Sequence, residues 1–210
     1  MTQDEWERGI ARADLCRFLA ACYYQPGPEF AEEKMFDSML AAAVRVSPDF
    51  GARARRMRDA FAAEDPQTLL VDYTRLFLGP VDTLAKPYGS AWLGGQQAVM
   101  QDSTVAVQQL YEEGGFEISE DFRELPDHVA AELEFLYLLI FRETEAQRIG
   151  DLESTNAMTA LRRRFLSEHL GAWIEPFTQA VENGAQTAFY GQLAELTRLF
   201  VMAEAAASRN

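Results

Sequence analysis

The sequence predicts an all-α protein, a single-domain helical bundle of about nine to ten helices that spans residues 1–210. Apolar residues recur with helical spacing through almost the whole chain. Breaks rich in glycine and proline divide this pattern into separate segments. No alternating run enriched in β-branched residues predicts a strand, and the chain contains no internal repeat.

The first helix carries one broad apolar stripe, because its apolar side chains fall at i, i+3, i+4, i+7 and i+8: Leu15, Phe18, Leu19, Cys22 and Tyr23. The Pro-Gly-Pro sequence at 26–28 ends this helix. Further helices are expected, in chain order, at about 29–46, 48–63, 66–78, 103–113, 128–148, 152–169, 172–182 and 187–206. Six residues on their apolar faces are expected to pack in the core: Tyr73, Leu76, Phe77, His169, Trp173 and Phe177.

Two breaks interrupt the helical pattern. The first, residues 79–95, contains four glycines and two prolines, and the second, 114–126, leads the chain to Asp127. Loops of this length usually carry function or move. Tyr88, Trp92 and Leu93 lie in the first break. Large apolar side chains in a loop either pack onto the core or form a contact surface, and both interpretations are open.

Composition limits the classes of protein to consider. A chain of 210 residues with 48% hydrophobic residues can bury one sizeable core, so one domain is expected. The N-terminus is acidic, and no apolar run approaches the ~18 residues that span a bilayer, so we expect a cytoplasmic protein. Cys16 and Cys22 point in different directions on one helix and are expected to be reduced core residues. Sequence motifs typical of zinc sites, redox pairs and P-loops are absent.

The net charge of −14 argues against nucleic acids and anionic membranes as partners, and favours a basic partner. Half of this excess lies in residues 66–128, which carry 10 acids and 3 bases. Its densest part contains Arg123 and seven acids: Glu112, Glu113, Glu117, Glu120, Asp121, Glu124 and Asp127. A solvated acidic loop and a recognition surface for a basic segment both explain this run. On the helix expected at 48–63, four arginines (Arg53, Arg55, Arg56 and Arg58) favour a solvated face over an anion site.

Pro126 and Asp127 form a helix start signal before a helix that should be buried nearly all round. Asp127 has two compatible interpretations. Its carboxylate could cap the following helix, or it could pair with the guanidinium group of an arginine. His128, in the first turn of that helix, is either a structural hydrogen-bonding histidine or part of a recognition site.

Three blocks of sequence, in this order, resemble the TorD/DmsD family of molybdoenzyme maturation chaperones. The blocks are Y-T-R-L-F-L-G-P at 73–80 with P-Y-G-S-A-W-L at 87–93, P-D-H-V-A-A-E-L-E-F at 126–135, and F-L-S-E-H-L-G-A-W at 165–173 with Phe189 and Tyr190. The resemblance implies a TorD-like all-helical fold, no enzymatic activity and no cofactor. It also implies a monomer or a domain-swapped dimer. Arg75, in the first block, is expected to pair internally, for example with an acid near the Asp127 turn.

The resemblance further implies a cytoplasmic chaperone that binds the twin-arginine leader and the apo form of a molybdopterin-dependent oxidoreductase before export. A twin-arginine leader presents an arginine pair next to an apolar stretch, which suits an apolar patch beside acids. The expected leader-binding residues are Tyr88, Trp92, Leu93, Glu124, Leu125, Pro126, Asp127 and His128.

An enzyme is the rival interpretation. A helical metal-carboxylate enzyme could use Glu132, Glu134 and His128, with His169 as a further ligand. His128 and Glu132 lie four residues apart on one helix face, but the sequence contains no second Glu-x-x-His pair. The sequence therefore favours a chaperone that binds no metal.

Overall fold

The computed structural model describes residues 1–27, 34–79, 83–94, 102–119 and 122–209. These residues form ten α-helices, one π-helix and no strand. In chain order they are α1 Gln3–Ala21, α3 Met35–Val46, α4 Pro48–Ala63, α5 Pro66–Tyr73, the π-helix η1 Thr74–Leu78, α6 Ser90–Leu93, α7 Asp102–Glu113, α8 Val129–Ile149, α9 Leu152–Glu168, α10 Leu170–Gly184 and α11 Ala188–Ala207. The predicted all-α fold class is confirmed.

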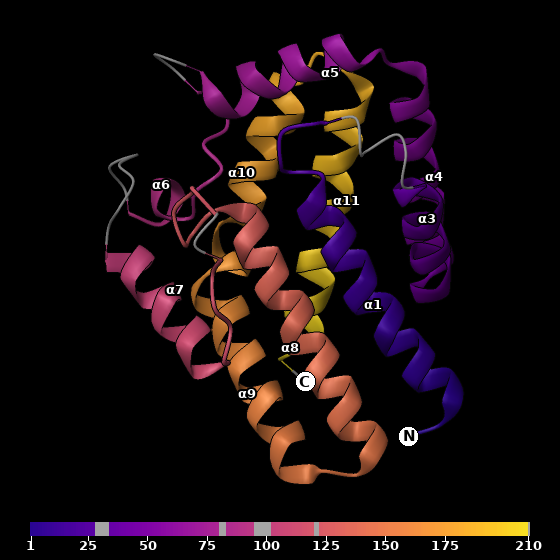
Figure 1. The fold of residues 1–210 in the computed structure, drawn as a ribbon, viewed down its shortest axis with the longest axis vertical. Helices are drawn as coiled ribbons and strands as arrows, with labels where there is room; N and C mark the ends of the chain where they lie inside the picture. The colour runs from indigo at the N-terminus through magenta and orange to yellow at the C-terminus, as the bar shows by residue number, and fades with distance from the viewer. Residues whose placement is uncertain (28–33, 80–82, 95–101, 120–121, 210) are drawn as a thin grey trace.

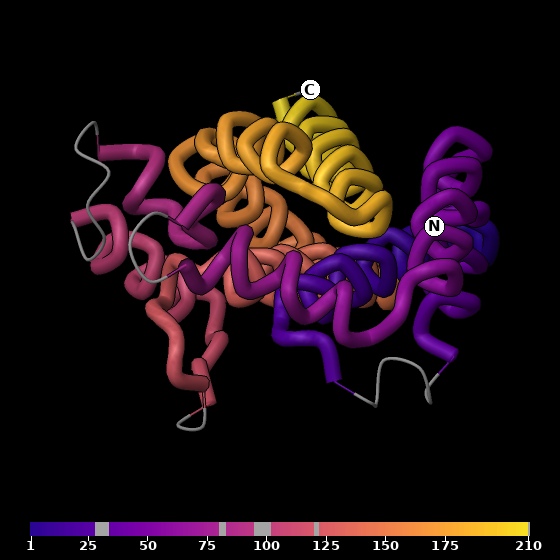
Figure 2. The backbone as a smooth tube through the Cα atoms, turned by 90° about the horizontal axis from the view of Figure 1, so that it is seen from above, coloured from indigo at the N-terminus to yellow at the C-terminus, as the bar shows by residue number. Residues whose placement is uncertain are grey.

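Helix α8 runs through the middle of the bundle, between α1 on one side and α9 on the other (Figure 1). Helices α10 and α11 form a second antiparallel pair behind them, and α3 and α4 form a third at the opposite edge from α6 and α7. Helix α5 and η1 cross the upper end of the bundle, as the view from above also shows (Figure 2). One core cluster unites these helices, and it extends from Ala11 to Val201.

Local signals in the sequence explain where most helices begin and end. Thr2 and Glu5 form a reciprocal capping box at the start of α1. Asp65 caps α5 in front of a proline, and Asp151 caps α9. Gly150 ends α8 in the left-handed conformation, with a φ of 77°. These boundaries agree with the predicted helices to within one or two residues.

Three expectations about the elements need correction. Residues 90–93, expected as part of a loop, form the short helix α6. The helix expected at 66–78 changes into a π-helix at Thr74. The helix expected at 29–46 begins at Met35 within the described residues, and positions 28–33 lie outside them. The six expected core residues are all buried, and so are both free cysteines.

The π-helix η1 lies beside a group of buried hydrogen bonds, formed by Asp72 and Arg75, that the sequence did not predict. Asp72 is 1% exposed, and its Oδ2 accepts hydrogen bonds from the backbone N–H groups of Gln186 and Thr187 at 2.9 and 2.8 Å. Arg75 donates to Asp72 at 2.7 Å and to the carbonyl oxygen of Gly184. The prediction that Arg75 pairs internally is confirmed, but its partner is Asp72 and not an acid near the Asp127 turn, and the guanidinium group ties η1 to the α10–α11 connection.

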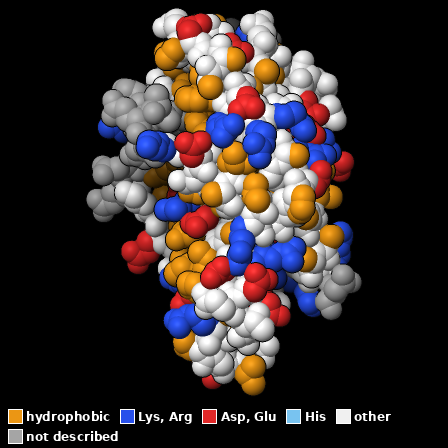
Figure 3. All heavy atoms as spheres, turned by 90° about the vertical axis from the view of Figure 1, so that its right-hand side faces the viewer, with side chains coloured by type: hydrophobic (Ala, Val, Ile, Leu, Met, Phe, Trp, Pro, Cys, Tyr) orange, Lys and Arg blue, Asp and Glu red, His pale blue; other side chains and the backbone are white. Residues whose placement is uncertain are grey.

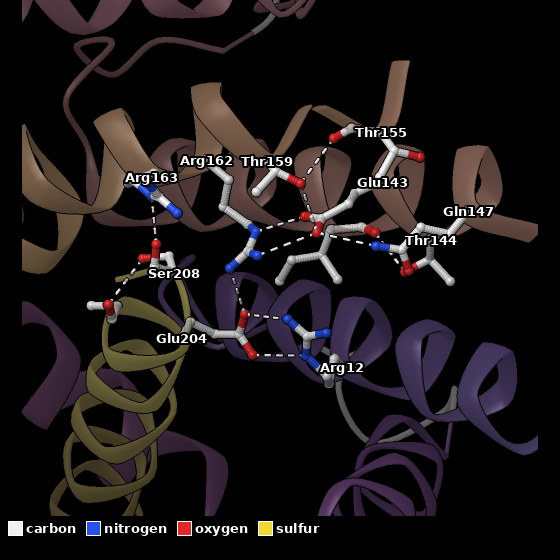
Figure 4. Close-up of polar contacts among 12 residues, drawn as sticks. Arg12, Glu143, Thr144, Gln147, Thr155, Thr159, Arg162, Arg163, Glu204 and Ser208 are labelled. Carbon is white, nitrogen blue, oxygen red and sulfur yellow. Dashed lines mark hydrogen bonds and ion pairs between the residues drawn. The ribbon is translucent and has the colours of Figure 1, made fainter. Parts of the chain in front are cut away.

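Buried ion pairs join α1, α8, α9 and α11 in the lower half of the bundle (Figure 4). Arg162 pairs with Glu143 at 2.8 Å and with Glu204 at 3.4 Å, and Arg12 pairs with Glu204 at 2.6 Å. The side chain of Arg162 is 6% exposed and that of Glu204 is 7% exposed. Each of these buried carboxylates therefore has a guanidinium partner.

Arginines on α4 take part in surface ion pairs. Arg53 pairs with Asp49 and Glu195, and Arg58 pairs with Asp59. Figure 3 shows the side of the molecule that carries α3 and α4, where basic and acidic side chains alternate with small hydrophobic areas. These contacts agree with a solvated helix face. Among the described residues, no helix combines the length and apolar character needed to cross a membrane.

Candidate functional site

The structure brings the first break of the sequence against the start of α8. The backbone N–H of Gly89 donates to the carbonyl oxygen of Asp127 at 2.8 Å, and that of Val129 donates to the carbonyl oxygen of Pro87 at 2.8 Å. Tyr88 and His128 thereby form an isolated antiparallel bridge. Two of the three sequence blocks, separated by 37 residues at Ser90 and Asp127, are thus joined in one turn.

Asp127 lies beneath this turn and is 1% exposed. Its Oδ2 accepts a hydrogen bond of 2.7 Å from the backbone N–H of Ser90, the first residue of α6. Within the described part of the chain, its Oδ1 is buried and has no hydrogen-bond partner. The interpretation of Asp127 as the cap of α8 is wrong, because its carboxylate satisfies a backbone group of α6. An arginine of a partner could touch this carboxylate only if the turn moved.

His128 is the N-cap of α8. Its Nδ1 accepts a hydrogen bond of 3.2 Å from the backbone N–H of Ala130, which requires that nitrogen to be unprotonated. Burial lowers the pKa of His128 to about 4, and the side chain is neutral at pH 7. The imidazole ring packs between three aromatic rings, with centroids 6.4 Å from Tyr24, 5.4 Å from Tyr88 and 6.0 Å from Phe122.

Glu132, one turn along α8, supports the turn from the interior. It is fully buried, and its Oε2 accepts a hydrogen bond of 3.0 Å from the indole Nε1 of Trp173. Burial raises the pKa of Glu132 well above its ordinary value, and the nearby carboxylate of Asp127 raises it further. Burial therefore favours the neutral form of this carboxyl group.

Gly89 packs directly onto this pair. A Cβ atom at position 89 would lie 2.9 Å from Nε1 of Trp173 and 3.0 Å from Oε1 of Glu132, so a larger residue would push the turn outward. In the sequence, Glu132 was a candidate only as a metal ligand of the rival metal-carboxylate enzyme. A glutamate on a helix expected to be buried nearly all round was the available indication of its role, but its partner on α10 could not be identified from spacing.

The surface above these buried groups combines aromatic, aliphatic and acidic side chains. Tyr88 is half-buried and donates its hydroxyl to the exposed carboxylate of Glu124. Trp92 is also half-buried; its Nε1 donates to the carbonyl oxygen of Lys86 at 2.8 Å, and its ring lies edge-on to Phe177 at 6.2 Å. We call this surface the aromatic–acidic face and define it by six residues: Tyr88, Trp92, Leu93, Glu124, Leu125 and Pro126. Glu124 is exposed, and the other five residues are half-buried.

Trp92 fits neither of its two interpretations completely. The side chain packs against the core and remains partly exposed. Among the other acids of the run, Glu112, Glu113 and Glu117 are exposed, and Glu113 pairs with Arg164. Glu120 and Asp121 lie outside the described residues.

The residues of the proposed metal site have separate partners. The carboxylate of Glu134 accepts a hydrogen bond of 2.8 Å from the hydroxyl of Tyr24, while Glu132 faces Trp173 and His128 caps its own helix. Across the residues that the structure describes, no three His, Cys, Asp or Glu side chains are grouped so that they could hold a metal ion. His169 is buried at the start of α10.

Comparisons with known proteins agree on one family. The family model of the nitrate reductase delta subunit matches residues 45–179. The chaperone protein TorD of Photobacterium profundum is 27% identical over 183 residues, which cover 85% of this chain and 82% of that protein. The Tat proofreading chaperone DmsD of Salmonella typhi is 30% identical over 139 residues, which cover 66% of this chain and 61% of that protein.

Two further similarities extend this result. A selenate reductase assembly chaperone of Thauera selenatis is 35% identical over 88 residues, or 42% of each chain. A crystal structure from Archaeoglobus fulgidus, assigned as a redox enzyme maturation protein, superposes with a TM-score of 0.56 and covers 90% of this chain and 93% of that one. At 21% sequence identity, this second similarity concerns the fold alone.

Proposed function

The chain belongs to the nitrate reductase delta subunit family, which includes the TorD and DmsD chaperones, and we propose that it binds the twin-arginine leader of a molybdopterin-dependent oxidoreductase. It is a molybdoenzyme maturation chaperone rather than an enzyme. In this proposal, the chaperone acts in the cytoplasm as a single domain. It holds the apo form of its client until the cofactor has been inserted and export can begin.

The observation that carries this proposal is the composition of the aromatic–acidic face. Tyr88, Trp92 and Leu93 offer apolar surface, and Glu124 places an exposed carboxylate at its edge. An arginine pair next to an apolar stretch presents the complementary chemistry, since guanidinium groups pair with carboxylates and also stack on aromatic rings.

Asp127 and His128 support the aromatic–acidic face from the interior of the protein. The carboxylate of Asp127 holds the backbone of Ser90, and the ring of His128 supports Tyr88. Both residues are at most 3% exposed, so their contribution is to fix the positions of the side chains that meet the leader.

Calorimetry with a synthetic leader peptide tests the proposal. The peptide should bind reversibly, and replacing both of its arginines by lysine should weaken binding, because an ammonium group cannot form the bidentate, planar contacts of a guanidinium group. Trp92→Ala should lower the affinity about fivefold or more, as expected for an aromatic anchor that loses its contact. Absence of measurable binding by the wild-type protein to any arginine-pair peptide would refute the proposal.

A further inference from the structure

A second apolar surface lies at the upper end of the bundle, away from the aromatic–acidic face. It is a groove of about 580 Å³ lined by residues of α5 and η1 together with Gly79 and Leu84. Its walls include Leu70, Val71, Thr74, Arg75 and Leu84. We call it the upper groove. The backbone N–H of Ala85 donates to the carbonyl oxygen of Leu76 at 3.0 Å and fixes the wall that carries Leu84.

Two large aliphatic side chains that line this groove are exposed: Val71 is 53% exposed and Leu84 is 44% exposed. Leu78, which precedes the lining residue Gly79 in the chain, is 46% exposed. Single exposed aliphatic residues are normal on a soluble protein, but two in one groove with a third next to it in the chain indicate a contact surface.

Of the polar side chains that line the groove, Gln67 is exposed, while Thr74 and Arg75 have partners within the protein. The hydroxyl of Thr74 donates to the carbonyl oxygen of Leu70 at 2.8 Å. The guanidinium group of Arg75 is held by Asp72 and by the carbonyl oxygen of Gly184, so its charge is balanced. The walls that carry Leu70, Val71 and Leu84 are apolar, which suits a segment with aliphatic side chains.

The position and charge of the groove limit the occupant. Leu84 in its wall and Tyr88 on the aromatic–acidic face are four residues apart, a span of at most about 14 Å of extended chain, so one bound peptide can reach both surfaces. Residues 66–128 carry 10 acids and 3 bases, so an acidic segment would be repelled.

We propose that the upper groove binds the apolar stretch that follows the arginine pair of the client's leader, while the aromatic–acidic face holds the arginine pair itself. This inference rests on the proposed function and assigns the second half of the leader to a second surface. Two contacts on one flexible peptide add affinity, because the second contact forms at high effective concentration once the first has been made.

The test compares Val71→Asp with a matched variant elsewhere. Val71 is exposed, so an aspartate at this position places a charge in the groove without opening the core. Leu152, which is 75% exposed at the start of α9, provides the control Leu152→Asp. Two peptides are used: the full leader and a truncated form that keeps the arginine pair but lacks the apolar stretch. Calorimetry measures the affinity of each protein for each peptide.

For the full leader, Val71→Asp should lower the affinity about tenfold, and Leu152→Asp should leave it within about twofold of wild type. For the truncated peptide, both variants should bind like wild type, because the apolar stretch that occupies the groove is missing. Leu84→Ser serves as the second groove variant, and it must reproduce the result if Val71→Asp lowers the melting temperature.

Several outcomes would overturn the inference. Unchanged affinity of both groove variants for the full leader would remove the groove from the binding site. Equal weakening for both peptides would show an indirect effect. A change of oligomeric state in ultracentrifugation with unchanged leader affinity would make the groove an interface between two copies of this chain. In each case wild-type binding survives and the proposed function stands, whereas loss of wild-type binding to both peptides would refute the proposed function itself.

Discussion

Buried carboxyl groups occur in two regions of the bundle, and their surroundings differ. In the lower half, Glu143 and Glu204 are paired with the guanidinium group of Arg162. Beneath the aromatic–acidic face, Glu132 has the indole N–H of Trp173 as its hydrogen-bond donor and, within the described residues, no cationic partner. Burial raises the pKa of Glu132 and so favours its neutral form, whereas the lower network pairs carboxylates with guanidinium groups.

This difference indicates two uses of a buried acid. A network of opposite charges fixes four helices to one another, and removing Arg162 leaves Glu143 without its cationic partner and Glu204 with Arg12 alone. A neutral carboxyl group behaves as a polar spacer, so an isosteric neutral residue can replace it. The lower network therefore belongs to the stability of the fold, while Glu132 belongs to the shape of the turn that carries Tyr88 and Trp92.

The largest expected effect concerns the lower network. Arg162→Met should destabilise the protein by about 3–5 kcal/mol, because Glu143 and Glu204 lose a buried partner. Leader affinity of the folded variant should stay near wild type, since this network lies on other helices than the aromatic–acidic face. Chemical denaturation and calorimetry measure the two quantities. Arg148→Ala, which breaks an exposed pair with Glu145, is the control and should change stability little. Equal stability of the Arg162 and Arg148 variants would contradict the comparison.

The second prediction uses the pH dependence of His128. Its pKa is about 4 in the folded protein and 6.5 when unperturbed. Between these two pH values the unfolded state therefore binds a proton that the folded state does not bind. Stability from this residue is fully present above pH 6.5 and is lost as the pH falls towards 4, amounting to about 2–3 kcal/mol between pH 7 and 4.5. His128→Ser keeps a capping side chain and lacks the imidazole. Denaturation of both proteins across this range should give a flatter slope for the variant, and parallel slopes would show that His128 titrates normally.

Helix caps and buried acids differ in how well the sequence predicted them. Capping residues such as Asp65 and Asp151 act within their own turn, so short motifs predicted the helix boundaries well. The partners of Asp127 and Glu132 lie 37 and 41 residues away, and their identity depends on how helices pack. The capping interpretation placed the carboxylate of Asp127 on the wrong helix, because proximity along the chain favoured α8 over α6.

The third prediction separates the neutral and charged forms of Glu132. Glu132→Ala should cost about 2–3 kcal/mol, since it leaves the indole N–H of Trp173 unsatisfied and opens a small cavity. Glu132→Gln should be close to wild type, because the amide oxygen accepts the same hydrogen bond. The folded pKa of Glu132 lies above its ordinary value of 4.5, so wild-type stability should decline relative to Glu132→Gln as the pH rises from 4.5 to 7. Denaturation at both pH values measures this difference, and an opposite sign would mean that Glu132 is ionised in the fold.

The smallest expected effect is that of Asp127→Asn, and it compares a buried acid with an exposed one. An asparagine oxygen can accept the hydrogen bond that the backbone N–H of Ser90 now donates at 2.7 Å, so stability should change by less than about 1 kcal/mol. Asp127 is 1% exposed, and leader affinity should stay within about twofold of wild type.

Glu124→Gln should weaken leader binding more and should flatten its salt dependence, because the exposed carboxylate of Glu124 supplies the attraction that salt screens. Calorimetry at low and physiological salt compares both variants. A loss of affinity and of salt dependence in Asp127→Asn at unchanged stability would show that the turn opens and that the leader's arginine reaches the buried carboxylate, which would move recognition from the surface into the interior.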